Sequence, residues 1–272
     1  MNLLNVRVLG AMLTVIPLWA VAAPPQYAVV DLGVADVAGA GLTWKDRKQP
    51  EPAPTWWPGG GPCAGNPPMP DVQAQFGDFA VGNVCQDERL GYVAAEWNIG
   101  STVTLTILGM MPGAKSGFGT DGDYASALDF NTRGDIVGYS DSPYDSYIPQ
   151  AHVPAAHGFI YNSGTWTDLI PLAGTSYNSA AEGINDSREV VGWTNTISSE
   201  TGGVLQRAFI DIGGVMYNLS FYLVGGPTVK LSDAYGIDCQ GNISASGTPA
   251  AGGRTHSYLL VRQGLPRTSC PQ

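Results

Sequence analysis

The sequence is poor in basic residues. Only 13 of its 272 residues are lysine or arginine, against 23 aspartates and glutamates, and the formal net charge is −10 at pH 7. Binding to duplex nucleic acid requires clustered basic side chains that displace counterions from the phosphates, and the sequence contains no such cluster. Nucleic acid is therefore excluded as a partner.

Long apolar runs are also missing beyond the N-terminus. The run at residues 8–19 follows Arg7 and leads into the small residues Ala20 and Ala22. A membrane-spanning helix needs about 20 apolar residues, whereas a short run between a positive charge and small residues is typical of a cleaved export signal. We expect residues 1–22 to be a signal peptide, residues 23–272 to form a single domain without a membrane span, and the mature protein to be secreted or periplasmic.

Recognised catalytic motifs are absent as well. The sequence has no G-x-S-x-G, H-E-x-x-H or Walker A pattern, and the G-x-G-x-x-G at residues 117–122 lacks the βαβ context that a phosphate site requires. Several acids resemble parts of a calcium loop without completing one: Asp121, Asp123, Asp129, Asp141 and Asp145. The sequence predicts no cofactor, with calcium as the alternative. It assigns no catalytic residue and leaves open whether the protein is an enzyme.

Glycine and proline, in contrast, are abundant, with 36 and 20 residues. Glycine supplies positive φ angles and proline presets the φ of a turn. This composition predicts an all-β protein with many short strands joined by tight turns.

An internal repeat organises the chain. Residues 127–138, 181–192 and 234–245 align with one another, and Phe130, Ile184 and Ile237 are 54 and 53 residues apart. In each copy a strand leads into an asparagine or aspartate turn, at Asn131, Asn185 and Asp238, and a second strand follows. Each copy therefore predicts a β-hairpin.

A second hairpin follows each of the first ones. Apolar and polar residues alternate on both sides of a glycine turn in residues 156–169 and 207–219, and the last copy stops after its first strand at residues 256–264. Residues 80–109 form an earlier, degraded copy. The N-terminal strand at residues 27–33 matches the final strand that the last copy lacks, so we expect it to complete that copy.

These copies predict a small β-propeller of about four four-stranded blades, closed by the N-terminal strand. Closure would hide the edge strands, which otherwise invite aggregation. Five blades, or an open array of β-repeats, are the alternatives.

The repeat resembles that of the HAF-repeat family of extracellular bacterial proteins. The family's His-Ala-Phe position holds His157-Gly158-Phe159, Arg207-Ala208-Phe209 and His256-Ser257-Tyr258, and residues 181–192 match its A-x-G-I-N-x-x-G-x-V-V-G stretch, with Arg188 where glycine is usual. The resemblance implies an exported β-repeat protein. It implies no reaction and no catalytic residues.

Four cysteines remain in a chain that we expect to be exported, where disulfides persist. Of the three pairings, we favour Cys63–Cys85 and Cys239–Cys270, which close local loops. No C-x-x-C pair favours a metal site instead.

Candidate ligand-binding residues lie outside the repeat. A Trp/Pro/Gly-rich insertion at about residues 44–70 carries Trp44, Trp56 and Trp57, and aromatic rings on a long loop are suited to ligand stacking; alternatively, they cap the core. His157 and His256 occupy equivalent repeat positions, which favours structural roles between sheets. His152 lies outside the repeat and is the freer histidine.

Three functions fit these observations. The first is a secreted or periplasmic binding protein that presents a rigid face and the aromatic loop to a glycan or an envelope protein. The second is a polysaccharide lyase or hydrolase with its active site on a propeller face. The third is a structural envelope protein without a ligand. The sequence leaves the oligomeric state open.

Overall fold

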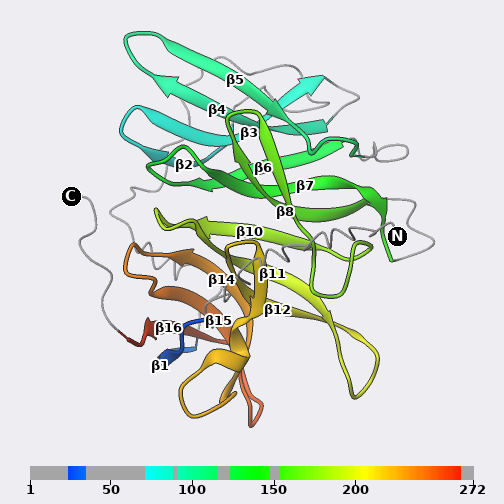
Figure 1. The fold of residues 1–272 in the computed structure, drawn as a ribbon, viewed down its shortest axis with the longest axis vertical. Helices are drawn as coiled ribbons and strands as arrows, with labels where there is room; N and C mark the ends of the chain where they lie inside the picture. Colours follow the sequence, from blue (N-terminus) through cyan, green and yellow to red (C-terminus); the bar gives the residue numbers. More distant parts are fainter. Residues whose placement is uncertain (1–23, 35–70, 88–90, 115–122, 148–153, 265–272) are drawn as a thin grey trace, which may run out of the picture.

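The computed structural model describes residues 24–34, 71–87, 91–114, 123–147 and 154–264. The described residues form an all-β protein, with one short 3-10 helix, η1 (Leu219–Tyr222), and no α-helix. Sixteen strands make four units of four antiparallel strands. Figure 1 shows these units stacked in chain order.

The first two units adjoin each other. They contain β2 (Asp71–Phe76), β3 (Phe79–Asp87), β4 (Gly91–Ile99) and β5 (Val103–Gly109), and then β6 (Asp123–Phe130), β7 (Ile136–Asp145), β8 (Pro154–Asn162) and β9 (Thr165–Leu169). A short parallel pairing of β4 with β6 joins them into one eight-stranded sheet. The degraded copy is thus a complete unit, and its opening strand is β2.

The third and fourth units are separate sheets. The third contains β10 (Ser179–Ile184), β11 (Glu189–Ile197), β12 (Val204–Ile212) and β13 (Val215–Asn218). The fourth contains β14 (Val229–Ile237), β15 (Ile243–Pro249), β16 (His256–Arg262) and, at its edge, the N-terminal strand β1 (Tyr27–Val34). The antiparallel pairing of β1 with β16 confirms that the N-terminal strand completes the last copy.

The first strand of every unit carries a β-bulge at the same place. The extra residue of each bulge is Gln73, Leu128, Glu182 or Tyr235. Opposite the bulge, the first three units have Gly82, Gly138 or Gly192, where a Cβ would overlap with a carbonyl oxygen of the bulged strand. The glycine of the V-V-G motif is therefore required by this close backbone approach.

The asparagine turns link successive units. The Asn131 side-chain oxygen accepts from the backbone nitrogens of Arg133 and Asp135, both at 3.0 Å, and Asn185 and Asp238 repeat this geometry. Asn131 Nδ2 also donates to the Asn185 carbonyl oxygen (3.1 Å), and Asn185 Nδ2 donates to that of Asp238 (3.2 Å). The turns thus form a hydrogen-bonded ladder along the stack.

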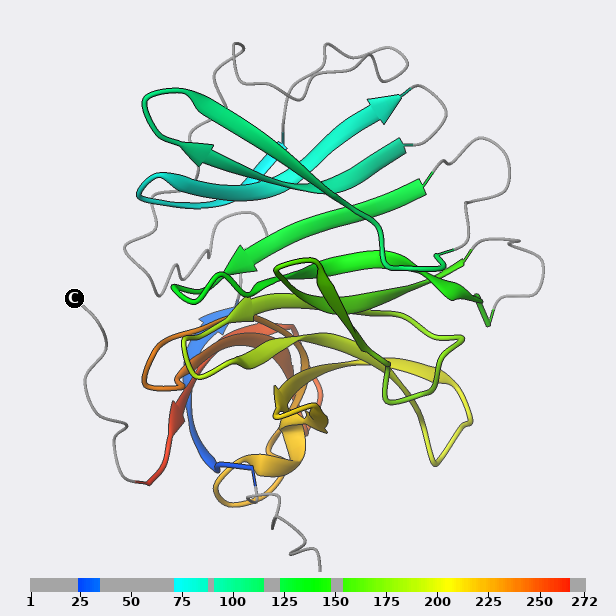
Figure 2. The same ribbon diagram turned by 45° about the horizontal axis from the view of Figure 1, so that its top comes forward.

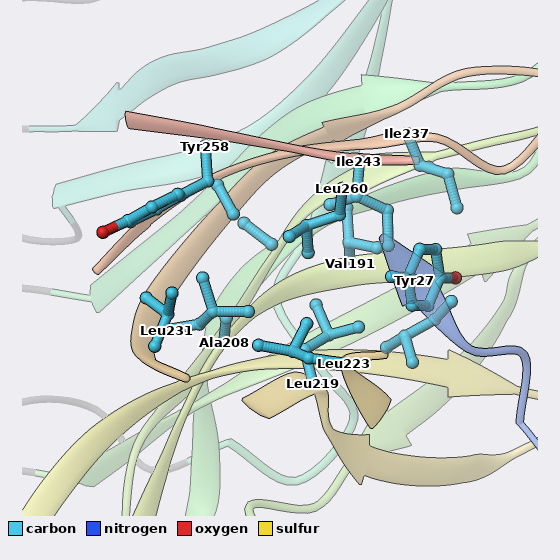
Figure 3. Close-up of a cluster of buried hydrophobic side chains, with 14 residues drawn as sticks. Tyr27, Val191, Ala208, Leu219, Leu223, Leu231, Ile237, Ile243, Tyr258 and Leu260 are labelled. Carbon is cyan, nitrogen blue, oxygen red and sulfur yellow. The ribbon is translucent and has the colours of Figure 1, made fainter. Parts of the chain in front are cut away.

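Apolar side chains fill the spaces between neighbouring sheets. Between the third and fourth units, Tyr27 of β1 points into a cluster that includes Val191, Leu231 and Ile243 (Figure 3). Val137 and Phe209 belong to the corresponding cluster between the second and third units. Because neighbouring sheets share these clusters, the units are not independent domains.

The row of units is not closed into a ring. Figures 1 and 2 show the first and fourth units at opposite ends of the stack. The sequence of the fourth unit explains why. Val81, Val137 and Val191 pack between sheets in the first three units, but their equivalent is Ser244. Asp238 also lacks the side-chain amide group with which Asn131 and Asn185 donate to the next turn. The expected closed propeller is not confirmed, and this arrangement agrees with an open β-repeat array.

Candidate functional site

The residues selected from the sequence as ligand-binding lie outside the described part of the chain. These are Trp44, Trp56, Trp57 and His152. The same is true of the export signal, Cys63 and Cys270. No free cysteine occurs among the described residues, but the pairing remains a prediction.

Each of the two repeat histidines pairs with an aspartate on the neighbouring strand of its own sheet. His157 is fully buried, with Nδ1 2.8 Å from Asp168 Oδ1 and Nε2 2.9 Å from the Thr175 carbonyl oxygen. His256 Nδ1 lies 2.8 Å from Asp31 Oδ2 on the neighbouring strand β1. Both histidines therefore act structurally, but they bond mainly within their own unit and not between sheets.

The acids considered for calcium binding have other roles where the structure describes them. Asp129 Oδ2 accepts from the Ile184 backbone nitrogen of the next unit at 2.9 Å, and Asp141 Oδ2 accepts from that of Tyr124 at 3.0 Å. Across the described ranges, no group of three or more His, Cys, Asp or Glu residues could hold a metal ion.

A different set of polar side chains runs across all four units. It begins at Asp71 on β2, passes through Tyr124 and Tyr139 on β6 and β7 and Glu182 on β10, and ends at Asp233 and Tyr235 on β14. These strands are neighbours, because β2 packs against β6, β6 against β10, and β10 against β14. We call these six residues the tyrosine–carboxyl stripe.

Tyrosine rings form one half of the stripe. The Tyr124 and Tyr139 ring centroids are 5.4 Å apart, and Tyr92 of β4 meets Tyr124 edge-on at 6.1 Å. Burial and a hydrogen bond to Tyr124 raise the pKa of Tyr139, and the negative charges of Asp71 and Glu182 add to this effect. Tyr124 is 41% exposed, so this half is open to solvent.

Two carboxyl groups form the other half. Burial raises the pKa of Glu182 to about 8, with a further contribution from the charge of Asp233, and burial raises the pKa of Asp233 to about 7. Tyr235 is 50% exposed, and its hydroxyl forms a hydrogen bond with Ser246 Oγ at 2.9 Å. Burial raises the pKa of Tyr235, and the charges of both acids raise it further. Near neutral pH this pair therefore holds protons that ordinary carboxylic acids would have released.

The sequence did not predict the stripe, because two of its residues occupy the variable position of the repeat. Glu182 and Tyr235 occupy the x of A-x-G-I-N, where the residue type changes from copy to copy. A bulge turns one side chain out of the strand's alternation and is common beside functional sites. In the sequence, the sign of a functional position is this variable residue inside an otherwise regular motif.

Comparison of the chain with protein-family models, with curated proteins and with solved structures found no match. Within the described residues, no helix has the length and apolar character needed to cross a bilayer.

Proposed function

We propose that this protein is an exported β-repeat binding protein that holds a glycan against the tyrosine–carboxyl stripe. The observation that carries the proposal is the convergence of tyrosine rings and carboxyl groups from all four units. Aromatic faces stack on the apolar faces of sugar rings, and carboxyl groups bond to hydroxyls. The resemblance to HAF-repeat proteins supports the proposed secreted or periplasmic location.

The binding site does not depend on ring closure. In an open array the stripe follows the packed first strands β2, β6, β10 and β14. In the four-bladed propeller that the repeat predicts, the same strands would line the centre. Either arrangement gives an extended site, which suits a polymer better than a small metabolite. Trp56 and Trp57 are proposed to add to this site from the insertion.

A glycan array followed by calorimetry tests the binding function. Tyr124→Ala and Tyr235→Ala remove exposed rings, so the fold should survive, and we expect each to weaken binding by about ten-fold. Phe221→Ala is the matched control, because Phe221 is 70% exposed on η1 and lies outside the stripe. Failure of the array to retain any glycan, or equal binding by all three variants, would refute the proposal.

A second function, glycan cleavage, is favoured by one observation. With its raised pKa, Glu182 can act as a general acid near neutral pH, and Asp233 lies close enough to affect its charge. In that case Glu182→Gln would abolish the release of new reducing or unsaturated ends from a bound polysaccharide while preserving binding. Unchanged turnover in this variant would exclude the mechanism.

A further inference from the structure

Two buried oxygen atoms in and beside the stripe have no hydrogen-bond partner. Asp233 Oδ1 is buried and has no hydrogen-bond partner, and neither has Asn83 Oδ1. Asn83 itself is 4% exposed and belongs to the same region, because its Nδ2 donates to Ser126 Oγ (3.0 Å) and Asp71 Oδ2 (3.3 Å). A buried acceptor without a donor costs about 1 to 3 kcal/mol, so the site is suited to a ligand that donates.

The charges of the stripe are all of one sign. Beyond the effect of burial, the charge of Asp233 on β14 raises the pKa of Glu182, and the charge of Glu182 raises the pKa values of Tyr235 and Tyr139. Tyr124 and Asp71 also raise the pKa of Tyr139. Among the described residues, no lysine, arginine or histidine contributes to the pKa values of Glu182, Asp233 or Tyr139. Once ionised, these groups repel an anionic polysaccharide and attract a cation.

Tyrosine rings beside these carboxyl groups strengthen the preference for a cation. An ammonium group over an aromatic face gains about 0.5 to 2 kcal/mol, depending on its desolvation. It also supplies three hydrogen-bond donors and no acceptor. A primary ammonium group thus matches both the tyrosine rings and the acids, whose unpaired oxygen is Asp233 Oδ1.

We propose that the glycan bound by the stripe is an amino sugar polymer with free amino groups, whose ammonium groups lie between the tyrosines and the Glu182–Asp233 pair. This inference rests on the proposed glycan-binding function and names its substrate class. Binding moves protons: the ammonium group displaces protons from the two carboxyl groups into solvent, and the resulting carboxylates pair with it.

Calorimetry with three oligosaccharides tests the inference. At pH 6.5, glucosamine oligomers should bind at least ten-fold more tightly than N-acetylglucosamine or cellulose oligomers of equal length. Heats measured in buffers of different ionisation enthalpy should show proton release with glucosamine oligomers only. Glu182→Gln and Asp233→Asn should remove both the preference and the proton release while retaining binding to the neutral oligomers.

Glu200→Gln is the matched control, because Glu200 is exposed in the β11–β12 loop and the variant makes the same exchange of Glu for Gln outside the stripe. It should keep the preference. Equal or tighter binding of the acetylated oligomer would overturn this inference and leave the binding function standing. A preference that survives in both stripe variants, or that Glu200→Gln also removes, would assign it to long-range attraction by the acidic protein. Absence of binding to all three oligosaccharides would refute this inference; the binding function would be refuted as well only if the glycan array also retained no glycan.

Discussion

Glu182 links the ionisation of the stripe to the stability of the protein. The folded-state pKa values of Glu182 and Asp233, about 8 and about 7, lie above the ordinary values of 4.5 and 3.8. Between about pH 4 and pH 8 the unfolded chain has therefore released protons that the folded chain still holds. The free energy of unfolding must fall as the pH rises through this window.

Glu182→Gln is expected to remove much of this dependence. The amide keeps the shape of the side chain but cannot ionise, so the variant should be more stable than the parent at pH 8 by about 2 kcal/mol and similar to it at pH 4. Urea unfolding at both pH values measures the difference. Glu200→Gln serves as the control and should follow the parent curve; a parent whose stability rises between pH 4 and pH 8 would contradict the assignment.

Gly192 illustrates a second residue-scale requirement. A Cβ at this position would overlap with the carbonyl oxygen of Ala180, which belongs to the bulged strand. Gly192→Ala should cost about 3 kcal/mol or more, because backbone on both sides must shift. Thermal unfolding compares it with Gly236→Ala, whose nearest neighbour would be Ser244 Oγ at an ordinary 3.6 Å, and which should be nearly neutral. Equal losses in the two variants would show that the close approach is not the cause.

Among the structural elements, β1 contacts both the third and the fourth units. It pairs with β16 along its length, and the Tyr27 carbonyl oxygen accepts from the Val224 backbone nitrogen at 2.8 Å. Tyr27 is fully buried among side chains of the third and fourth units. A strand at one end of the chain thus fixes the position of two units at the other.

Tyr27→Ala is expected to destabilise the protein by about 3 to 5 kcal/mol, as is usual when a large buried ring is removed. Leu32→Ala in the same strand is the comparison, because Leu32 is 46% exposed, and its cost should stay below about 1 kcal/mol. Chemical denaturation followed by tryptophan fluorescence would measure both. A small loss in Tyr27→Ala would mean that β1 is dispensable.

The repeat predicted most strands because its turns are chemically distinctive. Asn131, Asn185 and Asp238 each mark a hairpin, and glycine turns such as Gly213-Gly214, both with positive φ, mark the next. The strand β2 was not predicted, because the turn that follows it at Gly77-Asp78 lacks the asparagine motif. The stripe was not predicted either, because the proximity of Glu182, Asp233 and Tyr139 depends on how the sheets stack. The spacing of the repeat in the sequence does not specify that stacking.

At the scale of the whole molecule, the asparagine ladder joins the second, third and fourth units. Asn185 Nδ2 donates both to Glu189 Oε2 (2.9 Å) and to the Asp238 carbonyl oxygen of the next unit (3.2 Å). Glu189 is 1% exposed and is paired with Arg262 of the fourth unit, at 2.9 Å from both carboxylate oxygens. The third and fourth units are thus joined by polar contacts as well as by their shared core.

Asn185→Asp should weaken this junction. The new carboxylate would face Glu189 and could no longer donate, so we expect a loss of about 2 to 4 kcal/mol at pH 7. The loss should shrink on acidification, as protonation restores a donor. Hydrogen exchange would locate the loss in β14 to β16. Asn178→Asp is the comparison, because Asn178 Oδ1 accepts from the Ala156 backbone nitrogen and aspartate retains that acceptor. Uniform loss of protection in every unit would refute a local junction effect.

The pairing of the strand at one end of the chain with the strand near the other also sets the order of assembly. His256 and Asp31 are 225 positions apart, so their contact carries the full entropy of closing a loop that contains the three other units. Those units can gain their own hydrogen bonds from local hairpins first, whereas the fourth sheet waits for nearly the entire polypeptide to emerge. A chain cut short during synthesis would therefore leave β1 without its partner and expose the apolar ring of Tyr27, a feature by which quality-control proteases could distinguish unfinished molecules from finished ones.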